Sequence, residues 1–131
     1  MIIGFTGTQA GMSKSQKDNF ETIMTEISIF HPDFEFHHGD CIGADQEAHD
    51  IVSELTKNII IHPPSNSSKR AFCKAKTMLE SKPYLERNKD IVNVCEALIA
   101  CPKGSEILRS GTWSTIRYAK KINKIVYIIN A

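Results

Sequence analysis

Residues 97–129 read ALIACPKGSEILRSGTWSTIRYAKKINKIVYII, and this stretch predicts a strand, a loop, a helix and a second strand. ALIACP and KIVYII are short apolar runs, as expected for strands that are buried on both faces of a sheet. The helix between them is expected over Thr112–Ile122. Parallel strands are joined by helical crossovers of this kind. The stretch therefore predicts one β-α-β unit of a parallel sheet.

The same alternation of strand and helix extends over the rest of the chain. Further strands are expected at IIGFTG (2–7), FEFHHG (34–39) and NIIIHPP (58–64). Ser13 and Gln16 form a capping box at the start of the first helix, residues 43–56 carry a helical stripe, and Pro83 suits the first turn of the next helix. The sequence thus predicts a single α/β domain over residues 1–131, a three-layer Rossmann-like sandwich with a five-stranded parallel sheet in the order 3-2-1-4-5.

Composition excludes several classes of partner. Of the 131 residues 41% are hydrophobic and 24% charged, and the formal net charge is +1. A charge this close to zero gives no general attraction for nucleic acid or for an anionic membrane. No apolar run approaches the length of a membrane span, and the first residues, MIIGFTG, carry no basic leader. We expect a cytoplasmic protein with neither a membrane nor a nucleic acid as its partner.

The cysteines and histidines show no spacing that is typical of a metal site. Cys41, Cys73, Cys95 and Cys101 form no CxxC pair, which favours free thiols in a reducing compartment. The adjacent His37 and His38 point to opposite faces of a strand. The sequence therefore predicts neither a metal nor another cofactor.

The segment 65–82 departs from the alternating pattern. It is long and weakly patterned, and it holds five basic residues against the single acid Glu80. A solvated helical excursion is one interpretation. The other is a basic flap over a functional site, because long excursions from compact domains often carry function.

Glycine and small polar residues gather in three of the predicted strand-to-helix loops. These loops are TGTQAGMS after the first strand, HGDCIGAD after the second and CPKGSEILRSGT after the fourth. In a doubly wound sheet, ligands bind beyond the carboxyl ends of the strands where the winding reverses, and these three loops meet there. The pattern predicts a ligand site at this edge.

Two of the loops suggest which chemical groups the ligand presents. Asp40 and Asp45 lie near a helix N-terminus, where they either complement the helix dipole or bind ribose hydroxyls and base nitrogens. Ser110-Gly111-Thr112, preceded by Arg109, opens the last helix. This turn is either a simple cap or an anion site that uses free backbone N–H groups.

Three further residues leave a structural and a functional interpretation open. Trp113 either packs in the core or stacks on a base. Arg87, followed by Asn88, is either an exposed ion-pairing arginine or a ligand-binding one.

The motifs MIIGFTGT, HGDCIGAD, YLERNKDIV and ALIACP…RSGTWSTIRYA together resemble the SLOG superfamily of Rossmann-like proteins. This superfamily includes the lonely-guy phosphoribohydrolases, DNA-processing protein A and YpsA-like proteins. The phosphoribohydrolases carry a PGGxGTxxE pattern and an upstream arginine, which correspond here to Pro102, Gly111-Thr112 and Arg87. Lys103-Gly104 replaces the glycine pair, and Thr115 stands at the glutamate position.

Residue patterns and resemblance together predict a set of ligand-binding residues. These are Gly7, Thr8, Gln9, Gly39, Asp40, Gly43, Ala44, Asp45, Arg87, Asn88, Pro102, Arg109, Ser110, Gly111, Thr112 and Trp113. The leading hypothesis is a protein that senses or sequesters a nucleotide-derived signal, such as an ADP-ribose-type or cyclic nucleotide, in a conflict between phage and bacteria. The resemblance also implies a homo-oligomer.

Two alternatives remain. The first is an N-glycosidase that cleaves nucleoside 5′-monophosphates, or a deoxyribosyltransferase-like enzyme. Its candidate catalytic carboxylates are Asp40, Asp45 and Glu106, the last taking the place of the missing family glutamate. The second is a DNA-binding protein, which the net charge of +1 disfavours.

Overall fold

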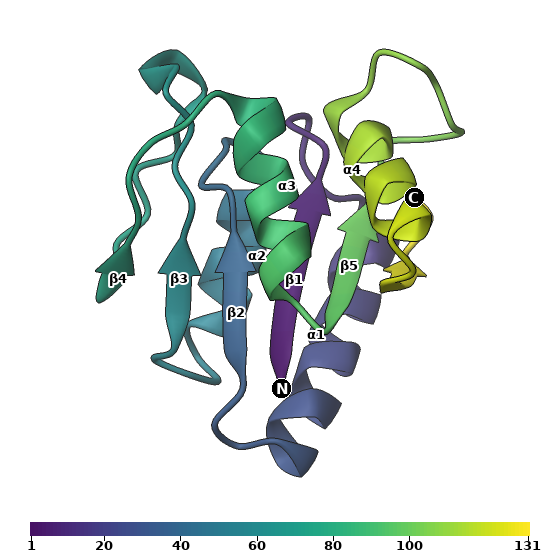
Figure 1. The fold of residues 1–131 in the computed structure, drawn as a ribbon. Coiled ribbons are helices and arrows are strands. Elements are labelled where there is room, and N and C mark those ends of the chain that lie inside the picture. Colours follow the sequence, from purple (N-terminus) through teal and green to yellow (C-terminus); the bar gives the residue numbers. More distant parts are fainter.

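The structure is a computed structural model that describes residues 1–131. Six parallel strands form one sheet in the order β4-β3-β2-β1-β5-β6 (Figure 1). The strands are β1 (Ile2–Gly7), β2 (Glu35–His38), β3 (Ile59–Ile61), β4 (Thr77–Met78), β5 (Ala97–Cys101) and β6 (Ile125–Ile128). The helices are α1 (Lys14–Phe30), α2 (Ala44–Val52), the 3₁₀ helix η1 (Ser67–Lys69), α3 (Tyr84–Val94) and α4 (Gly111–Lys121).

The predicted five-stranded sheet is corrected to six strands by β4. This strand pairs with β3 through Ile60↔Thr77 and Ile61↔Met78. It lies in the segment 65–82 and has two residues, both exposed, so no apolar pattern marked it in the sequence. The five predicted strands keep their predicted order within the larger sheet. The segment 65–82 contains one short 3₁₀ helix, and the helical excursion is therefore not observed.

Helices cover both faces of the sheet and make the three predicted layers. On one face α1 and α2 bury a core that includes Phe20, Met24 and Val52, together with Phe5 and Phe36 from the sheet. On the other face α3 and α4 pack side by side over a smaller core. None of the helices is long and apolar enough to cross a membrane.

Hydrogen bonds of Ser13 and Gln16 cap helix α1 and attach it to the sheet. Gln16 N donates to Ser13 Oγ over 3.1 Å and Ser13 N donates to Gln16 Oε1 over 3.0 Å, so the predicted capping box is confirmed. The buried Gln16 amide also donates to the carbonyls of Pro102 and Ile129, at 2.8 Å each. This amide therefore ties α1 to the carboxyl ends of β5 and β6, beside the loop that leads to α4.

Candidate functional site

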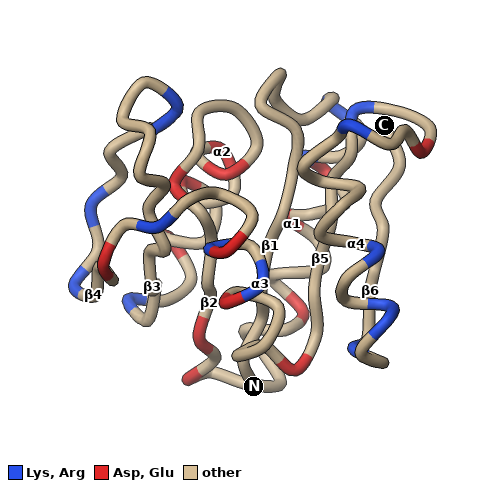
Figure 2. The backbone as a smooth tube through the Cα atoms, turned by 45° about the horizontal axis from the view of Figure 1, so that its top comes forward, with Lys and Arg blue, Asp and Glu red and all other residues tan.

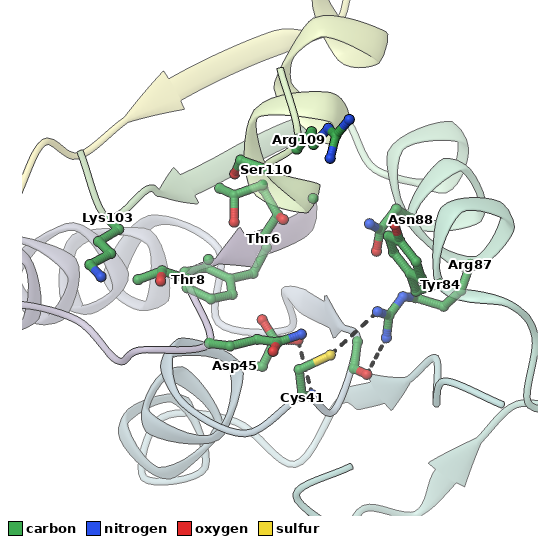
Figure 3. Close-up of a pocket in the computed structure, with 16 residues that line it drawn as sticks. Thr6, Thr8, Cys41, Asp45, Tyr84, Arg87, Asn88, Lys103, Arg109 and Ser110 are labelled. Carbon is green, nitrogen blue, oxygen red and sulfur yellow. Dashed lines mark hydrogen bonds between the residues drawn. The ribbon is translucent and has the colours of Figure 1, made fainter. Parts of the chain in front are cut away.

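A cavity of about 340 Å³ lies at the carboxyl ends of β1, β2 and β5, the edge predicted from the loops. Eleven of the predicted ligand-binding residues line it: Gly7, Thr8, Gln9, Gly39, Asp45, Arg87, Asn88, Arg109, Ser110, Gly111 and Thr112. Five lining residues were not predicted: Phe5, Thr6, Cys41, Tyr84 and Lys103. Figure 3 shows Tyr84, Arg87 and Asn88 on one side of the cavity and Lys103 with Thr8 on the other.

Arg87 is buried in the cavity wall, with 4% of its surface exposed. Its Nη1 donates to the carbonyls of Gly39 and His62, the latter at 3.0 Å, and its Nη2 donates to Cys41 Sγ at 3.4 Å (Figure 3). Its Nε has no hydrogen-bond partner. The interpretation of an exposed ion-pairing arginine is therefore wrong, because the guanidinium is buried and its partners are uncharged.

The N-terminus of α4 is capped by a side chain and also has free backbone N–H donors. Ser110 Oγ accepts from Trp113 N at 3.2 Å, so Ser110 is the helix cap. The N–H groups of Gly111 and Thr112 open the helix, where no intrahelical acceptor exists, and both residues line the cavity. A Cβ atom at Gly111 would approach only the Tyr84 ring, at 3.7 Å. The turn thus serves as a cap and also presents donors to the cavity.

Asp45 supplies the one carboxyl group that lines the cavity. The residue is buried, and its Oδ2 accepts from Cys41 N at 3.2 Å. Burial raises the pKa of this carboxyl from 3.8 to about 6, although the nearby Arg87 charge opposes the rise. The group can therefore exchange a proton near neutral pH. Burial also raises the pKa of the Cys41 thiol, which keeps this cysteine protonated and a poor nucleophile.

Asp40 does not face the cavity, contrary to the sequence-based expectation. Its Oδ2 accepts from Arg70 Nε at 2.7 Å and its Oδ1 from Cys73 N at 2.9 Å. The residue is fully buried and has a positive φ of 57°. The Asp40 carboxylate therefore anchors the segment 65–82 to the β2–α2 loop.

Four other predicted residues also lie outside the cavity lining, namely Gly43, Ala44, Pro102 and Trp113. Gly43 has a φ of 90°, and a Cβ there would collide with the backbone carbonyl of Gln9. It therefore allows the β1–α1 loop to approach the start of α2. Trp113 Nε1 donates to Gly104 O at 3.2 Å, which holds the loop before α4 and does not present the ring to the cavity.

Neither the family glutamate position, which is Thr115 here, nor its suggested substitute Glu106 provides an acid to the cavity. Glu106, in the loop between β5 and α4, forms an exposed ion pair with Arg117 at 2.9 Å and does not line the cavity. Arg117 also donates to Leu108 O at 3.1 Å. Thr115, at the glutamate position, is buried and donates from Oγ1 to Gly111 O at 2.8 Å. Asp45 is therefore the one candidate of the three catalytic carboxylates that reaches the cavity.

The cavity carries an excess of positive charge. Arg87, Lys103 and Arg109 line it against the single carboxyl of Asp45. Elsewhere basic and acidic segments are interspersed in the view of Figure 2. The excess is therefore local, and it favours an anionic ligand. Lys103 was recognisable in the sequence as the residue that replaces a family glycine, but its direction toward the cavity was not.

Two histidine pairs lie on opposite faces of β2, as predicted for His37 and His38. His37 Nδ1 lies 2.8 Å from His62 Nε2, and His38 Nε2 lies 3.0 Å from His49 Nδ1. The ligand atoms of His38, His49 and Cys73 lie within 4.8 Å of one another.

The backbone beside His38 disfavours a metal at this group. Asp40 N donates to His38 Nδ1 at 3.0 Å, which places the proton of the neutral ring on Nε2. Nε2 then donates to His49 Nδ1, and neither of these two nitrogens keeps a lone pair for a metal. Asp40 N, His38 and His49 therefore form a chain of hydrogen bonds.

Comparisons with known proteins address the fold. No protein-family profile matches the sequence, and no curated protein is significantly similar to it. Among solved structures, the molybdenum cofactor binding protein from Rippkaea orientalis is 20% identical with a TM-score of 0.77, over 99% of this chain and 76% of that chain. The molybdenum cofactor carrier protein from Chlamydomonas reinhardtii is 17% identical with a TM-score of 0.73, over 99% and 78%.

A third solved structure is that of DNA processing protein A from Helicobacter pylori, whose description concerns single-stranded DNA binding. It is 17% identical with a TM-score of 0.68, and the match covers 98% of this chain but 64% of that chain. The three structures have SLOG-type Rossmann-like folds. The predicted resemblance to the SLOG superfamily is thus confirmed at the level of the fold.

Proposed function

We propose, from this SLOG-type fold and its positively charged cavity, that the protein binds a small nucleotide-derived ligand. The phosphate of the ligand would lie between Arg87 and the N-terminus of α4. The observation that carries the proposal is the buried Arg87 guanidinium, which lines the cavity and forms no ion pair. A buried charge that no direct ion pair compensates is costly, and an anionic ligand would reduce that cost.

The rest of the cavity supports the same type of ligand. Free N–H groups at a helix start bind phosphate through hydrogen bonds and the helix dipole. Lys103 and Arg109 add two cations at the cavity, and hydroxyl groups of Thr6, Thr8 and Ser110 line it. A volume of about 340 Å³ suits a ligand of mononucleotide size. Two structural neighbours are named as a molybdenum cofactor binding protein and a molybdenum cofactor carrier protein, and this supports a small-ligand site in the present chain.

Calorimetric titration with AMP, ADP-ribose and a cyclic dinucleotide tests the proposal. Gly111→Asp is expected to abolish binding while the protein stays folded, since a Cβ fits at this position and the new carboxylate would repel the phosphate. Gly104→Asp is the matched control, because a Cβ there meets no atom within 4 Å and the residue does not line the cavity. Unchanged affinity in a folded Gly111→Asp variant would place the anion elsewhere.

Asp45 favours a second candidate, the N-glycosidase. A buried carboxyl with a pKa of about 6 beside a ligand can deliver a proton to a leaving base while water adds to the anomeric carbon. Incubation with AMP distinguishes the two functions, because an enzyme releases adenine and ribose 5-phosphate whereas a binding protein returns AMP intact. If base is released, Asp45→Asn is expected to abolish the release with little change in affinity.

The DNA-binding neighbour weakens the prediction that nucleic acid is not a partner. A single-stranded oligonucleotide therefore belongs in the same titration. We expect it to bind more weakly than AMP, because basic and acidic groups are interspersed over the fold and form no basic stripe in the view of Figure 2.

A further inference from the structure

A second cavity, of about 250 Å³, adjoins the first on the other side of Arg87. Its lining residues are Gln9, Cys41, Pro64, Ser65, Asn66, Lys69, Pro83, Tyr84 and Arg87. Gln9, Cys41, Tyr84 and Arg87 line both cavities. The two cavities are therefore neighbouring parts of one site, and the segment 65–82 contributes the outer wall of the second.

The second cavity is lined in part by apolar rings, and backbone pairing holds two of the lining segments together. Pro64, Pro83 and Tyr84 provide rings on its sides. Pro64 pairs with Lys82 in a parallel bridge, and Ser65 N donates to Lys82 O at 2.9 Å. This pairing fixes the spacing between the two chain segments that enclose the cavity. A preformed cavity with apolar rings in its lining, one of them the planar ring of Tyr84, suits an aromatic ring of a ligand.

Polar groups on the rim of the second cavity have unused hydrogen-bonding capacity. The side chains of Gln9 and Ser65 form no hydrogen bond in the protein, and Lys69 forms no side-chain ion pair. Asn66 Oδ1 accepts from Ser68 N at 3.1 Å, which leaves the Asn66 amide N–H groups free. No carboxylate lines this cavity. These donors and acceptors match the edge of a nitrogen heterocycle.

We propose that the second cavity is the subsite for a flat nitrogen heterocycle, the nucleobase of the ligand whose phosphate occupies the first cavity. This inference rests on the proposed function and adds the part of the ligand that gives selectivity. Arg87 separates the two subsites, so one residue contacts both ends of the ligand. The segment 65–82 then has a role in recognition as a wall of the base subsite.

Titrations with AMP and with ribose 5-phosphate test the subsite, because the two probes share a phosphate and a ribose but differ in the base. AMP is expected to bind at least 10-fold more tightly. Ser65→Trp fills the second cavity and is expected to reduce AMP affinity to that of ribose 5-phosphate, whose own affinity stays within 2-fold. Ser81→Trp is the matched control, since Ser81 lies exposed on the same segment and lines neither cavity.

A milder variant covers the case in which Ser65→Trp does not fold. Asn66→Asp keeps the oxygen that caps η1 but removes the free amide donors, so AMP is expected to bind at least 3-fold more weakly with no change for ribose 5-phosphate. Equal affinities for the two probes in the natural protein, or equal losses in a folded variant, would overturn the subsite and leave the phosphate site standing. If neither probe binds, the proposed function fails and the subsite fails with it.

Discussion

Asp40 in the β2–α2 loop and Asp45 in the first turn of α2 are both buried near an arginine, but the two aspartates make different contacts. Toward the segment 65–82, Asp40 and Arg70 form an ion pair at 2.7 Å. Toward the cavity, Asp45 and Arg87 form no ion pair, and Arg87 donates to two carbonyls and a thiol. The charges of Asp40 and Arg70 therefore neutralise each other within the protein. Arg87 forms no ion pair, so its charge is available to an anionic ligand.

This difference separates a structural role from a binding role. Groups that a protein buries for stability are normally satisfied within the fold, and departures from this rule concentrate at functional sites. Arg87 Nε is the one buried side-chain nitrogen or oxygen in the protein without a hydrogen-bond partner. This unpaired atom is buried, and it belongs to a residue that lines the cavity. Arg87 therefore differs from Arg70, whose charge is paired with Asp40.

Removing the anchoring carboxylate is expected to have the largest effect on stability. Asp40→Ala leaves Arg70 and the Cys73 N–H without their partner, so the free energy of unfolding is expected to fall by about 3 kcal/mol. Asp40→Asn keeps an acceptor and tolerates the positive φ, and it should cost less. Urea denaturation measures both. An Asp40→Ala protein as stable as the natural one would mean that the ion pair does not anchor the segment.

Removing the charge of Asp45, the carboxyl that lines the cavity, is expected to stabilise the fold, whereas removing the Asp40 carboxylate destabilises it. Its pKa is about 6 in the folded protein and 3.8 ordinarily, so folding takes up a proton between these pH values. The contribution of Asp45 to stability therefore rises as pH falls through 6 and levels off below about 3.8. Asp45→Asn is expected to raise the free energy of unfolding by about 3 kcal/mol at pH 8, where the carboxylate is charged, and by about half as much at pH 5.

Denaturation of the natural protein and of Asp45→Asn at the two pH values provides the check. A variant that is less stable than the natural protein at pH 8 would show that the charged form is favoured in the fold. The expectation that burial disfavours the charged form of Asp45 would then be wrong. The expectation for the Asp40 ion pair would not be affected.

Of the substitutions considered, loss of the Glu106–Arg117 ion pair is expected to have the smallest effect on stability and on ligand affinity. Glu106 and Arg117 are both exposed, 55% and 37% at the side chain, and exposed pairs contribute less than about 1 kcal/mol. Glu106→Ala should therefore change the denaturation midpoint little and should leave ligand affinity intact. A loss of affinity of at least 30-fold, the loss expected for Arg87→Gln, would show that Glu106 takes part in ligand binding.

The sequence predicted most of the architecture and the edge of the sheet at which the cavity lies. Five strands were recognisable because apolar runs and loop glycines recur along the chain, and the binding edge follows from parallel topology. β4 was not recognisable, because its two residues are exposed and show no alternation.

The roles of the two aspartates could not be predicted, because they depend on distant partners. Asp40 and Asp45 are five residues apart and look equivalent in the sequence, but Asp40 lies in the β2–α2 loop and Asp45 in the first turn of α2. Arg70, which pairs with Asp40, is 30 residues away in a segment without a hydrophobic pattern. Arg87 is buried by groups 25 to 48 residues away. Contacts of this range arise only when the chain is folded.

The most direct test of the central claim compares the two arginines with a single probe. Ribose 5-phosphate is titrated into the natural protein, Arg87→Gln and Arg70→Gln, each shown to be folded. The two substitutions remove one charge and keep a polar side chain. Arg87→Gln is expected to weaken binding at least 30-fold, about 2 kcal/mol for the loss of charge-assisted hydrogen bonds. Arg70→Gln is expected to stay within 3-fold. Equal losses, or a larger loss at Arg70, would contradict the claim that Arg87, and not Arg70, is available to the ligand.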